Sequence, residues 1–341
     1  MIDLSTRYLG LDLASPLVAS ASPLTKRLDG VRALEDGGAS AIVMHSLYEE
    51  EIAFDQRAHD HFLDFGSEAF AEALDYVPFP QTSPGPDQYL DLLREAKAAV
   101  DVPIIGSLNG DTPGGWTRYA GMIEEAGADA LELNVFLLAS DPDVAGADVE
   151  AHTLEVVREV CERTSIPVAV KISTFWSSIL DVARRLDRAG ADGLVLFNRF
   201  YQPDIDLEAF EVLPRLTLST PESARIAVRW IGMLDGHVDA DMALTSGVHD
   251  AEGALKGIAA GATVTMMTSQ ILKHGPGRFR EIEADLRTWL EEKEYDSVTQ
   301  LRGALSRRGS RDEEAFVRAN YKATLDAWRP PSTRRGPIPG R

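Results

Sequence analysis

Short apolar runs and helical stretches alternate along this chain. Eight apolar runs of strand length begin near Leu17, Ala41, Pro103, Ala130, Val168, Gly193, Asp241 and Thr263. Stretches with the period of an amphipathic helix lie between most of them, for example residues 29–36, 117–126, 151–163, 177–189 and 252–260. Strands that alternate with helices indicate a parallel sheet whose strands are joined by crossover helices.

The beginnings of these strands follow two repeated patterns. Four strands come after a Gly-Ala pair, at residues 38–39, 127–128, 190–191 and 261–262. Glycine suits the left-handed residue that ends a helix, and alanine lets the following turn pack closely. Three intervening strands begin instead at Pro16, Pro103 and Pro167, and proline is tolerated as the first residue of a strand. This alternation predicts a barrel built from two-strand units.

The predicted fold class is therefore α/β, a (β/α)8 TIM barrel with its active-site loops at the carboxyl ends of the strands. A doubly wound sheet is the alternative, but it would carry a glycine-rich phosphate loop, and neither G-x-G-x-x-G nor G-x-x-x-x-G-K-[ST] occurs. Long insertions follow strands 2 and 6, at residues 47–99 and 199–236. We expect the barrel to span residues 1–293. A helical extension over 294–328 is expected to dock on it through Phe316, Leu325 and Trp328, ahead of a disordered tail over 329–341.

Composition and charge limit the kind of partner. The formal net charge of −20 argues against a nucleic acid or an anionic membrane, because both need a positive protein face. Cys161 is the single cysteine, so no internal disulfide can form and a reducing compartment fits. Residues 1–4 show no basic segment followed by an apolar one, so we expect no export signal, and no apolar run approaches the roughly 20 residues of a membrane span. We expect a soluble, cytoplasmic protein.

Polar side chains gather where the predicted strands end. The most informative is Lys171, because a lysine within an apolar strand is costly unless it meets an anion or an anionic ring. The alternative for Lys171 is a place at the rim, where it points to water. Small residues after strands 7 and 8, Thr245–Gly247 and Thr268–Ser269, stand where barrels commonly bind phosphate. A phosphate at one end and an electron-rich ring at the other describe flavin mononucleotide (FMN).

The chain resembles the dihydroorotate dehydrogenase superfamily of FMN-dependent (β/α)8 barrels, over roughly Leu9 to Lys293. The resemblance rests on Glu132-Leu-Asn134, Val170-Lys171, residues 191–198, Leu218-Ser219, Gly247-Val248 and Gly275-Pro276. It implies FMN as the cofactor, with Asn134, Lys171 and Asn198 along the flavin ring and ribityl chain. The expected FMN-binding residues are Ser20, Ala21, Ser22, Asn109, Asn134, Lys171, Asn198, Ser219, Ser246, Gly247, Thr268 and Ser269.

The substrate half of the family's site is not matched. Family members carry Asn-x-Ser-Cys-Pro-Asn after strand 4, with Cys or Ser as the base that takes a proton from dihydroorotate. Here Leu137 occupies the base position, and Ala139 stands at an orotate-binding asparagine. The family's strand-2 lysine falls on Met44, and Asp75 and residues 78–81 replace its asparagine clamp.

A leucine cannot accept a proton, so the catalytic residues are unknown. His45, Ser46 and Tyr48, after strand 2, are the nearest candidates for a replacement acid or base, although a lone histidine such as His45 is more often structural. His249 follows the expected phosphate loop and either contacts the phosphate or caps a helix. Residues 59–61, His-Asp-His, lack a third ligand, so we expect no metal site. Cys161 is expected to belong to the core.

Three functions follow. The first is an FMN-dependent oxidoreductase resembling dihydroorotate dehydrogenase, an enzyme of pyrimidine biosynthesis, acting on a small-molecule substrate that the missing base leaves open. The second is a non-catalytic flavin- or phosphate-binding barrel that serves as a carrier or a complex subunit. The third is an aldolase that uses Lys171 as a Schiff-base lysine. The family is commonly dimeric, which is the sole ground for expecting a homodimer.

Overall fold

The computed structural model describes residues 2–48, 85–110, 113–135, 139–199, 203–213, 216–309 and 321–328. Its centre is a closed parallel barrel, with β4 paired to both β3 and β6 and β5 extending the second strand along β6. The strands are β3 (Leu17–Ala19), β4 (Ile42–Val43), β5 (Leu47–Tyr48), β6 (Ile104–Gly110), β7 (Ala130–Val135), β8 (Val168–Ile172), β9 (Gly193–Leu196), β12 (Asp241–Thr245) and β13 (Val264–Met267). The predicted (β/α)8 barrel is confirmed, and each predicted strand begins within one residue of its observed start.

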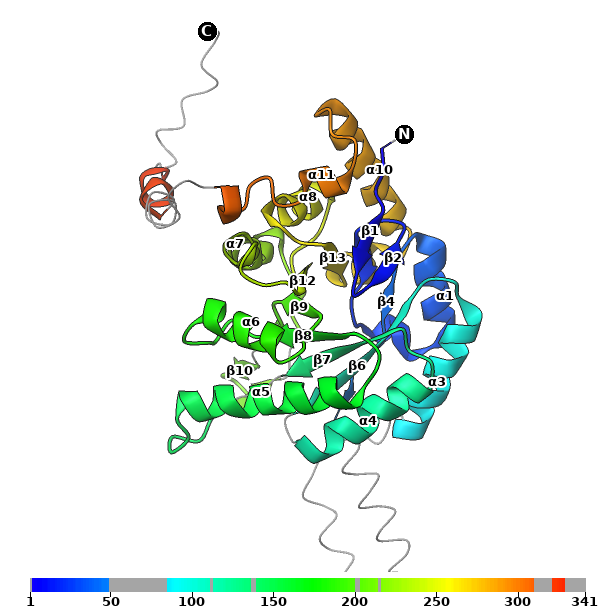
Figure 1. Cartoon of the computed structure of the whole chain (residues 1–341), viewed down its shortest axis with the longest axis vertical. Coiled ribbons are helices and arrows are strands. Elements are labelled where there is room, and N and C mark those ends of the chain that lie inside the picture. Colours follow the sequence, from blue (N-terminus) through cyan, green and yellow to red (C-terminus); the bar gives the residue numbers. More distant parts are fainter. Residues whose placement is uncertain are drawn as a thin grey trace, which may run out of the picture.

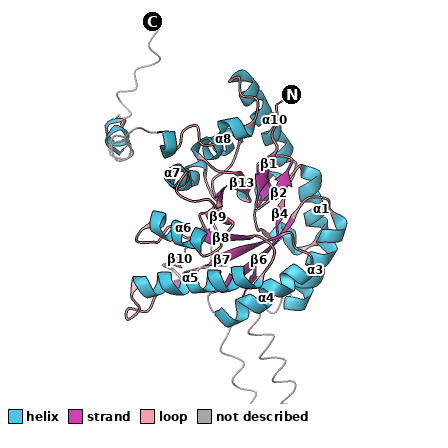
Figure 2. Ribbon diagram, in the orientation of Figure 1, coloured by secondary structure: helices cyan, strands magenta, loops and turns pink. Residues whose placement is uncertain are grey.

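Helices surround the strands on the outside of the barrel (Figures 1 and 2). The crossover helices are α1 (Leu28–Gly37), α3 (Pro86–Ala99), α4 (Pro113–Glu125), α5 (Gly146–Arg163), α6 (Ile179–Arg188), α7 (Ala224–Leu234) and α8 (Ala251–Ala260). After the last strand come α9 (Ser269–His274), α10 (Arg278–Glu292) and α11 (Val298–Leu301). The inner faces of these helices and the outer faces of the strands form the larger hydrophobic core.

The repeated strand beginnings have the geometry that the sequence predicts. Gly38, Gly127, Gly190 and Gly261 have φ of 102°, 95°, 105° and 125°, so each Gly-Ala pair begins with a left-handed residue that ends the preceding helix. The prolines contribute carbonyl groups in place of amides. The carbonyl oxygen of Pro103 accepts the amide of Ile42 at 3.0 Å, and that of Pro167 accepts the amide of Leu131 at 2.9 Å.

An N-terminal hairpin closes the barrel at the end where the strands begin. Strands β1 (Thr6–Tyr8) and β2 (Leu11–Leu13) pair antiparallel, and Tyr8 and Leu9 join the inward-facing residues of the barrel in one buried cluster. The amide of Leu9 donates to Asp241 Oδ2 at 2.9 Å. The apolar pattern did not predict this hairpin, since each of its strands has only three residues.

The structure divides both predicted insertions. In the first, residues 86–99 form α3, an ordinary crossover helix. The hydroxyl of its Tyr89 accepts the amide of Ser107 on β6 at 2.9 Å. Residues 49–84 lie outside the described residues. The second insertion holds an exposed hairpin, β10 (Asp204–Asp206) and β11 (Glu211–Leu213), followed by α7.

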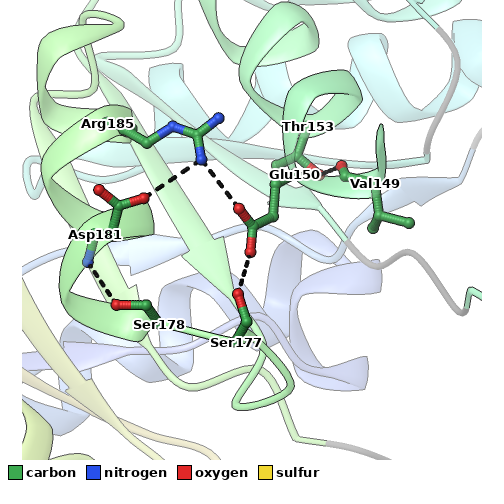
Figure 3. Close-up of polar contacts among 7 residues, drawn as sticks. All are labelled: Val149, Glu150, Thr153, Ser177, Ser178, Asp181 and Arg185. Atoms are coloured by element: carbon green, nitrogen blue, oxygen red, sulfur yellow. Dashed lines mark hydrogen bonds and ion pairs between the residues drawn. The ribbon is translucent and has the colours of Figure 1, made fainter. Parts of the chain in front are cut away.

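A polar cluster joins α5 and α6 beside the loop that follows β8 (Figure 3). Arg185 Nη1 lies 3.0 Å from Glu150 Oε2 and 3.4 Å from Asp181 Oδ2. The hydroxyl of Ser177 donates to Glu150 Oε1 at 2.7 Å, and Ser178 caps α6. These contacts hold the loop that begins two residues after Lys171.

The chain beyond residue 293 packs on the barrel up to Gly309 through the buried side chains of Val298 and Leu301. Residues 321–326 are helical, and Leu325 and Trp328 are 60% and 71% exposed. Phe316 and residues 329–341 lie outside the described residues, so docking of the terminal helix and disorder of the tail stay predictions. Among the helices that the structure describes, none is long and apolar enough to cross a membrane.

Candidate active site

A cavity opens at the carboxyl ends of β3, β8, β9, β12 and β13. It is lined by nine of the twelve residues predicted to bind FMN, namely Ser20, Ala21, Lys171, Asn198, Ser219, Ser246, Gly247, Thr268 and Ser269. The sequence did not single out Arg199, Phe197 or Leu216, which also line it. Among the described residues of the lining, Lys171 and Arg199 are charged and none is acidic. The cavity therefore favours an anion.

The barrel register brings the predicted amide and amine side chains together. Asn109 on β6 is the register partner of Asn134 on β7, which is the partner of Lys171 on β8. Partners on neighbouring parallel strands point to the same face of the sheet. Asn134 does not line the cavity itself, but its Oδ1 accepts Asn198 Nδ2 at 2.7 Å, and Asn198 does line it. Ser22 and Asn109 stand outside the lining.

Lys171 meets an anion within the protein. Its Nζ lies 3.1 Å from Glu132 Oε1, and the two residues are 8% and 1% exposed. This pair explains why an apolar strand carries Glu132, because a buried carboxylate is tolerable beside a cation. The sequence predicted an anionic partner for Lys171 but did not identify Glu132, which lies 39 residues away along the chain. Lys171 also lines the cavity, so it faces both Glu132 and any ligand bound there.

A tight turn after β12 forms one wall of the cavity. Ser246 and Gly247 have φ of 73° and 79°, both in the left-handed region. A Cβ atom on Gly247 would overlap the backbone nitrogen of Ala224 and lie 2.9 Å from the carbonyl oxygen of Thr220. Glycine is therefore required both by the backbone conformation and by the close approach of the chain before α7.

Hydroxyl groups from two separate loops meet at the cavity. Ser219 Oγ donates to Ser269 Oγ at 2.8 Å, and the amide of Ser219 donates to the same oxygen at 3.0 Å. His249 Nε2 lies 3.1 Å from Ser219 Oγ. Burial, and then the charge of Lys273, lowers the pKa of His249 below its ordinary value of 6.5. Of the two roles left open for His249, contact with the phosphate site through Ser219 is the one that this geometry favours.

The candidate acids and bases after strand 2 do not line the cavity. His45 is buried, its Nδ1 lies 3.0 Å from the carbonyl oxygen of Thr25, and its ring makes an edge contact with Tyr89. This is the environment of a structural histidine. Ser46 Oγ lies 2.8 Å from Ser107 Oγ, and Tyr48 is the register partner of Asn109. Leu137 lies outside the described residues.

Within the described ranges, no group of three or more His, Cys, Asp or Glu side chains is placed to hold a metal ion. Residues 59–61 fall in the stretch that the structure does not describe.

The closed parallel barrel, with a cationic, hydroxyl-lined cavity at the carboxyl ends of its strands, is the architecture of the (β/α)8 enzymes, which keep their active sites at this end of the barrel. Within that class, the family model for dihydroorotate dehydrogenase matches residues 80–290, and the chain belongs to this family. The members of this family are FMN-dependent oxidoreductases, so the resemblance read from the sequence is confirmed.

Curated relatives cover between about two thirds and nine tenths of the chain. One is the catalytic subunit of dihydroorotate dehydrogenase B (NAD(+)) from Thermoplasma volcanium, 27% identical over 316 residues, which cover 90% of this chain and 100% of the relative. A putative dihydroorotate dehydrogenase A (fumarate) from Aeropyrum pernix is 29% identical over 310 residues, 88% of this chain and 97% of its own length. A catalytic subunit from Desulforudis audaxviator is 32% identical over 67% of this chain and 75% of the relative.

Proposed function

We propose that this protein binds FMN in the cavity at the carboxyl ends of the strands and oxidises or reduces a small molecule there. The observation that carries the proposal is the lining itself. Its described residues combine Lys171, Arg199 and the hydroxyls of Ser219 and Ser269 and include no carboxylate. Such donors suit a phosphate monoester, and a lysine with amide side chains suits the acceptor atoms of a flavin ring.

The proposed division of labour follows the fold. Ser219, Ser246, Gly247, Thr268 and Ser269, all after strands 6 to 8, would hold the phosphate. Lys171 and Asn198 would contact the ring and ribityl chain, with Asn134 orienting the amide of Asn198. Ser20 and Ala21 would close the cavity from the side of β3. Bound FMN would supply the hydride-transfer chemistry. The positive charge of Lys171 would stabilise an electron-rich ring, and the ion pair with Glu132 would keep the lysine side chain oriented within the barrel.

The step that removes a proton from the substrate is proposed to differ from that of the family. The relatives are named dihydroorotate dehydrogenases. On that ground we propose that this chain acts in pyrimidine biosynthesis. Leu137 stands at the family's base position and cannot take a proton. We propose that either the substrate needs no such base or a group after strand 2 replaces it, with Ser46 and Tyr48 closer to that role than the structurally bonded His45.

The test begins with the visible absorption spectrum of the purified protein. Flavin bands, with FMN released on denaturation, are expected. Anaerobic addition of dihydroorotate, and of a panel of other small CH–CH donors, then shows which compound bleaches the flavin. A protein that is colourless and takes up no added FMN would overturn the proposal. Binding with bleaching by a compound other than dihydroorotate would support an altered substrate.

A non-catalytic flavin-binding subunit is the second candidate, and Leu137 is the observation that favours it. In that case bound FMN would stay oxidised with every donor, while reduction by dithionite would still succeed. The Schiff-base aldolase has less support. Such an enzyme needs a neutral amine, whereas Lys171 is held in an ion pair with Glu132. Borohydride trapping of a carbonyl compound on Lys171 would reinstate it.

The remaining parts of the proposal are a cytoplasmic location and a homodimer. A single cysteine suits a reducing compartment, and the dimer rests on the habit of the family alone. Light scattering on the eluted peak of a size-exclusion column tests the dimer directly, since the monomer has a mass of 37.2 kDa.

A further inference from the structure

A chain of hydrogen bonds leads from the protein interior to the cavity. Gln270 Nε2 lies 2.9 Å from His249 Nδ1, and His249 Nε2 lies 3.1 Å from Ser219 Oγ. Ser219 Oγ lies 2.8 Å from Ser269 Oγ. Ser219 and Ser269 line the cavity. His249 and Gln270 are not part of the lining and reach it through these hydrogen bonds.

The residue types set the direction of this chain. The amide nitrogen of Gln270 can only donate, so His249 Nδ1 accepts, and the neutral imidazole then carries its proton on Nε2. His249 Nε2–H donates to Ser219 Oγ, whose own hydrogen goes to Ser269 Oγ. Ser269 Oγ also accepts the amide of Ser219 at 3.0 Å. With both acceptor positions of Ser269 filled, its hydrogen points away from these partners and toward the cavity that it lines.

The surroundings of His249 support the neutral, fixed ring. Burial and the charge of Lys273 lower its pKa, and they outweigh the opposite effects of Asp250, the Ser219 contact and Glu222. Arg278 Nη2 donates to the carbonyl oxygen of His249 at 3.2 Å and holds the backbone of this residue in place.

We propose that His249 is a positioning residue for the phosphate group of a phosphate-monoester cofactor. Held by Gln270 as the Nε2–H tautomer, it orders the hydroxyls of Ser219 and Ser269 so that Ser269 donates to a phosphate oxygen. This inference rests on the proposed function, because it takes the cavity as the FMN site.

A comparison of FMN with riboflavin tests the inference. Riboflavin has the same ring and ribityl chain but no phosphate. We expect His249→Ala to weaken FMN binding by roughly threefold to tenfold, the range that one net hydrogen bond is worth. Riboflavin affinity should stay within about twofold of the wild-type value, since His249 acts at the phosphate end. Quenching of flavin fluorescence during titration of the flavin-free full chain measures both affinities.

Further variants separate positioning from a general loss of structure. Gln270→Leu should lower the preference for FMN in the same direction, because it releases the ring of His249 from its fixed tautomer. His249→Gln should restore part of the preference, since its carboxamide can donate to Ser219. His274→Ala, which removes an exposed histidine at the end of α9, is the matched control and should change neither affinity.

The outcomes distinguish this inference from the proposed function. Equal losses for FMN and riboflavin, or an unchanged FMN-to-riboflavin ratio in both His249→Ala and Gln270→Leu, would overturn the role of His249. A wild-type protein that binds neither flavin would overturn the proposed function instead. A lowered ratio in Gln270→Leu supports the inference even where His249→Ala fails to fold.

Discussion

Within the barrel, Lys171 and Glu132 place opposite charges where either one alone would be costly. The second carboxylate oxygen of Glu132, Oε2, is buried and has no hydrogen-bond partner among the described residues. Glu132 therefore depends on Lys171, while Lys171 also faces the cavity. Removal of one member of such a pair leaves an uncompensated buried charge, whereas removal of both can be nearly neutral.

We predict that Glu132→Gln lowers the free energy of unfolding by about 3 kcal/mol, because it leaves the Lys171 ammonium without its counterion. The double variant Glu132→Gln, Lys171→Met should recover much of this loss. Urea denaturation of the two single variants and the double variant measures the coupling. Additive losses in the double variant would mean that the two residues do not stabilise each other.

The thiol of Cys161 gives a second prediction at this scale. Burial, and then the charge of Asp192, raises its pKa to about 12, so the reactive thiolate is scarce at pH 8. We expect the native protein to react with a colorimetric disulfide reagent at least roughly 100-fold more slowly than the urea-unfolded chain at that pH. The rate should rise as the pH approaches the raised pKa. A fast native reaction at pH 8 would contradict the packing of the partly buried Cys161 against the core.

At the scale of elements, the sequence predicted the strands well because their signals are local. A Gly-Ala pair or a proline sets the conformation of its own neighbours. Strands after a proline begin at the next residue, and strands after a Gly-Ala pair begin two or three residues after the alanine. The N-terminal hairpin and the β10–β11 hairpin were missed, since three-residue strands carry too little pattern. The partners of Lys171 and His249 were missed for another reason. They lie 39 and 21–30 residues away in the sequence, and only the closed barrel brings them together.

Two glycines with positive φ should respond differently to the same substitution. Alanine at Gly127 would meet only Lys97 Cγ, at 3.7 Å, so the cost is conformational, about 1 kcal/mol. Alanine at Gly247 adds an overlap with the backbone before α7, for which we expect a loss on the order of 3 kcal/mol together with weaker FMN binding. Urea unfolding and flavin titration of both variants make the comparison. Equal losses in stability would show that the turn after β12 relaxes freely.

At the scale of the whole molecule, the terminal helix carries large apolar side chains on one face. Tyr321 and Leu325 lie in the helix over residues 321–326, and Trp328 follows two residues after it. The three side chains have helical spacing and are 67%, 60% and 71% exposed. An apolar groove on the barrel is lined by Leu255, Trp289, Leu301 and Leu305 among others. Leu305 precedes by four residues Gly309, where the described chain ahead of this helix ends. This groove is therefore a specific candidate for the surface on which the end of the 294–328 extension docks.

We predict that ending the chain after Gly309 lowers the thermal midpoint, because each docked large side chain contributes about 2 kcal/mol of burial. Trp328→Ala in the full chain should reproduce part of this effect, because it removes one of the side chains expected to dock. Lys322→Ala, on the same helix, is the control and should leave the midpoint unchanged. Unfolding by calorimetry at two protein concentrations separates docking within one chain from pairing between chains. An unchanged midpoint after truncation would contradict docking altogether.

The N-terminal hairpin has a consequence for the order in which the molecule is assembled. Its residues are synthesised before the barrel strands, yet the amide of Leu9 finds its acceptor on Asp241, 232 residues later in the chain. Until β12 has been synthesised, Tyr8 and Leu9 have no complete pocket, so the hairpin is covered late although it is made before the barrel. Nascent chains that end before β12 should therefore expose this hairpin and be recognised by chaperones there. The hairpin can close its end of the barrel only after β12 has been made.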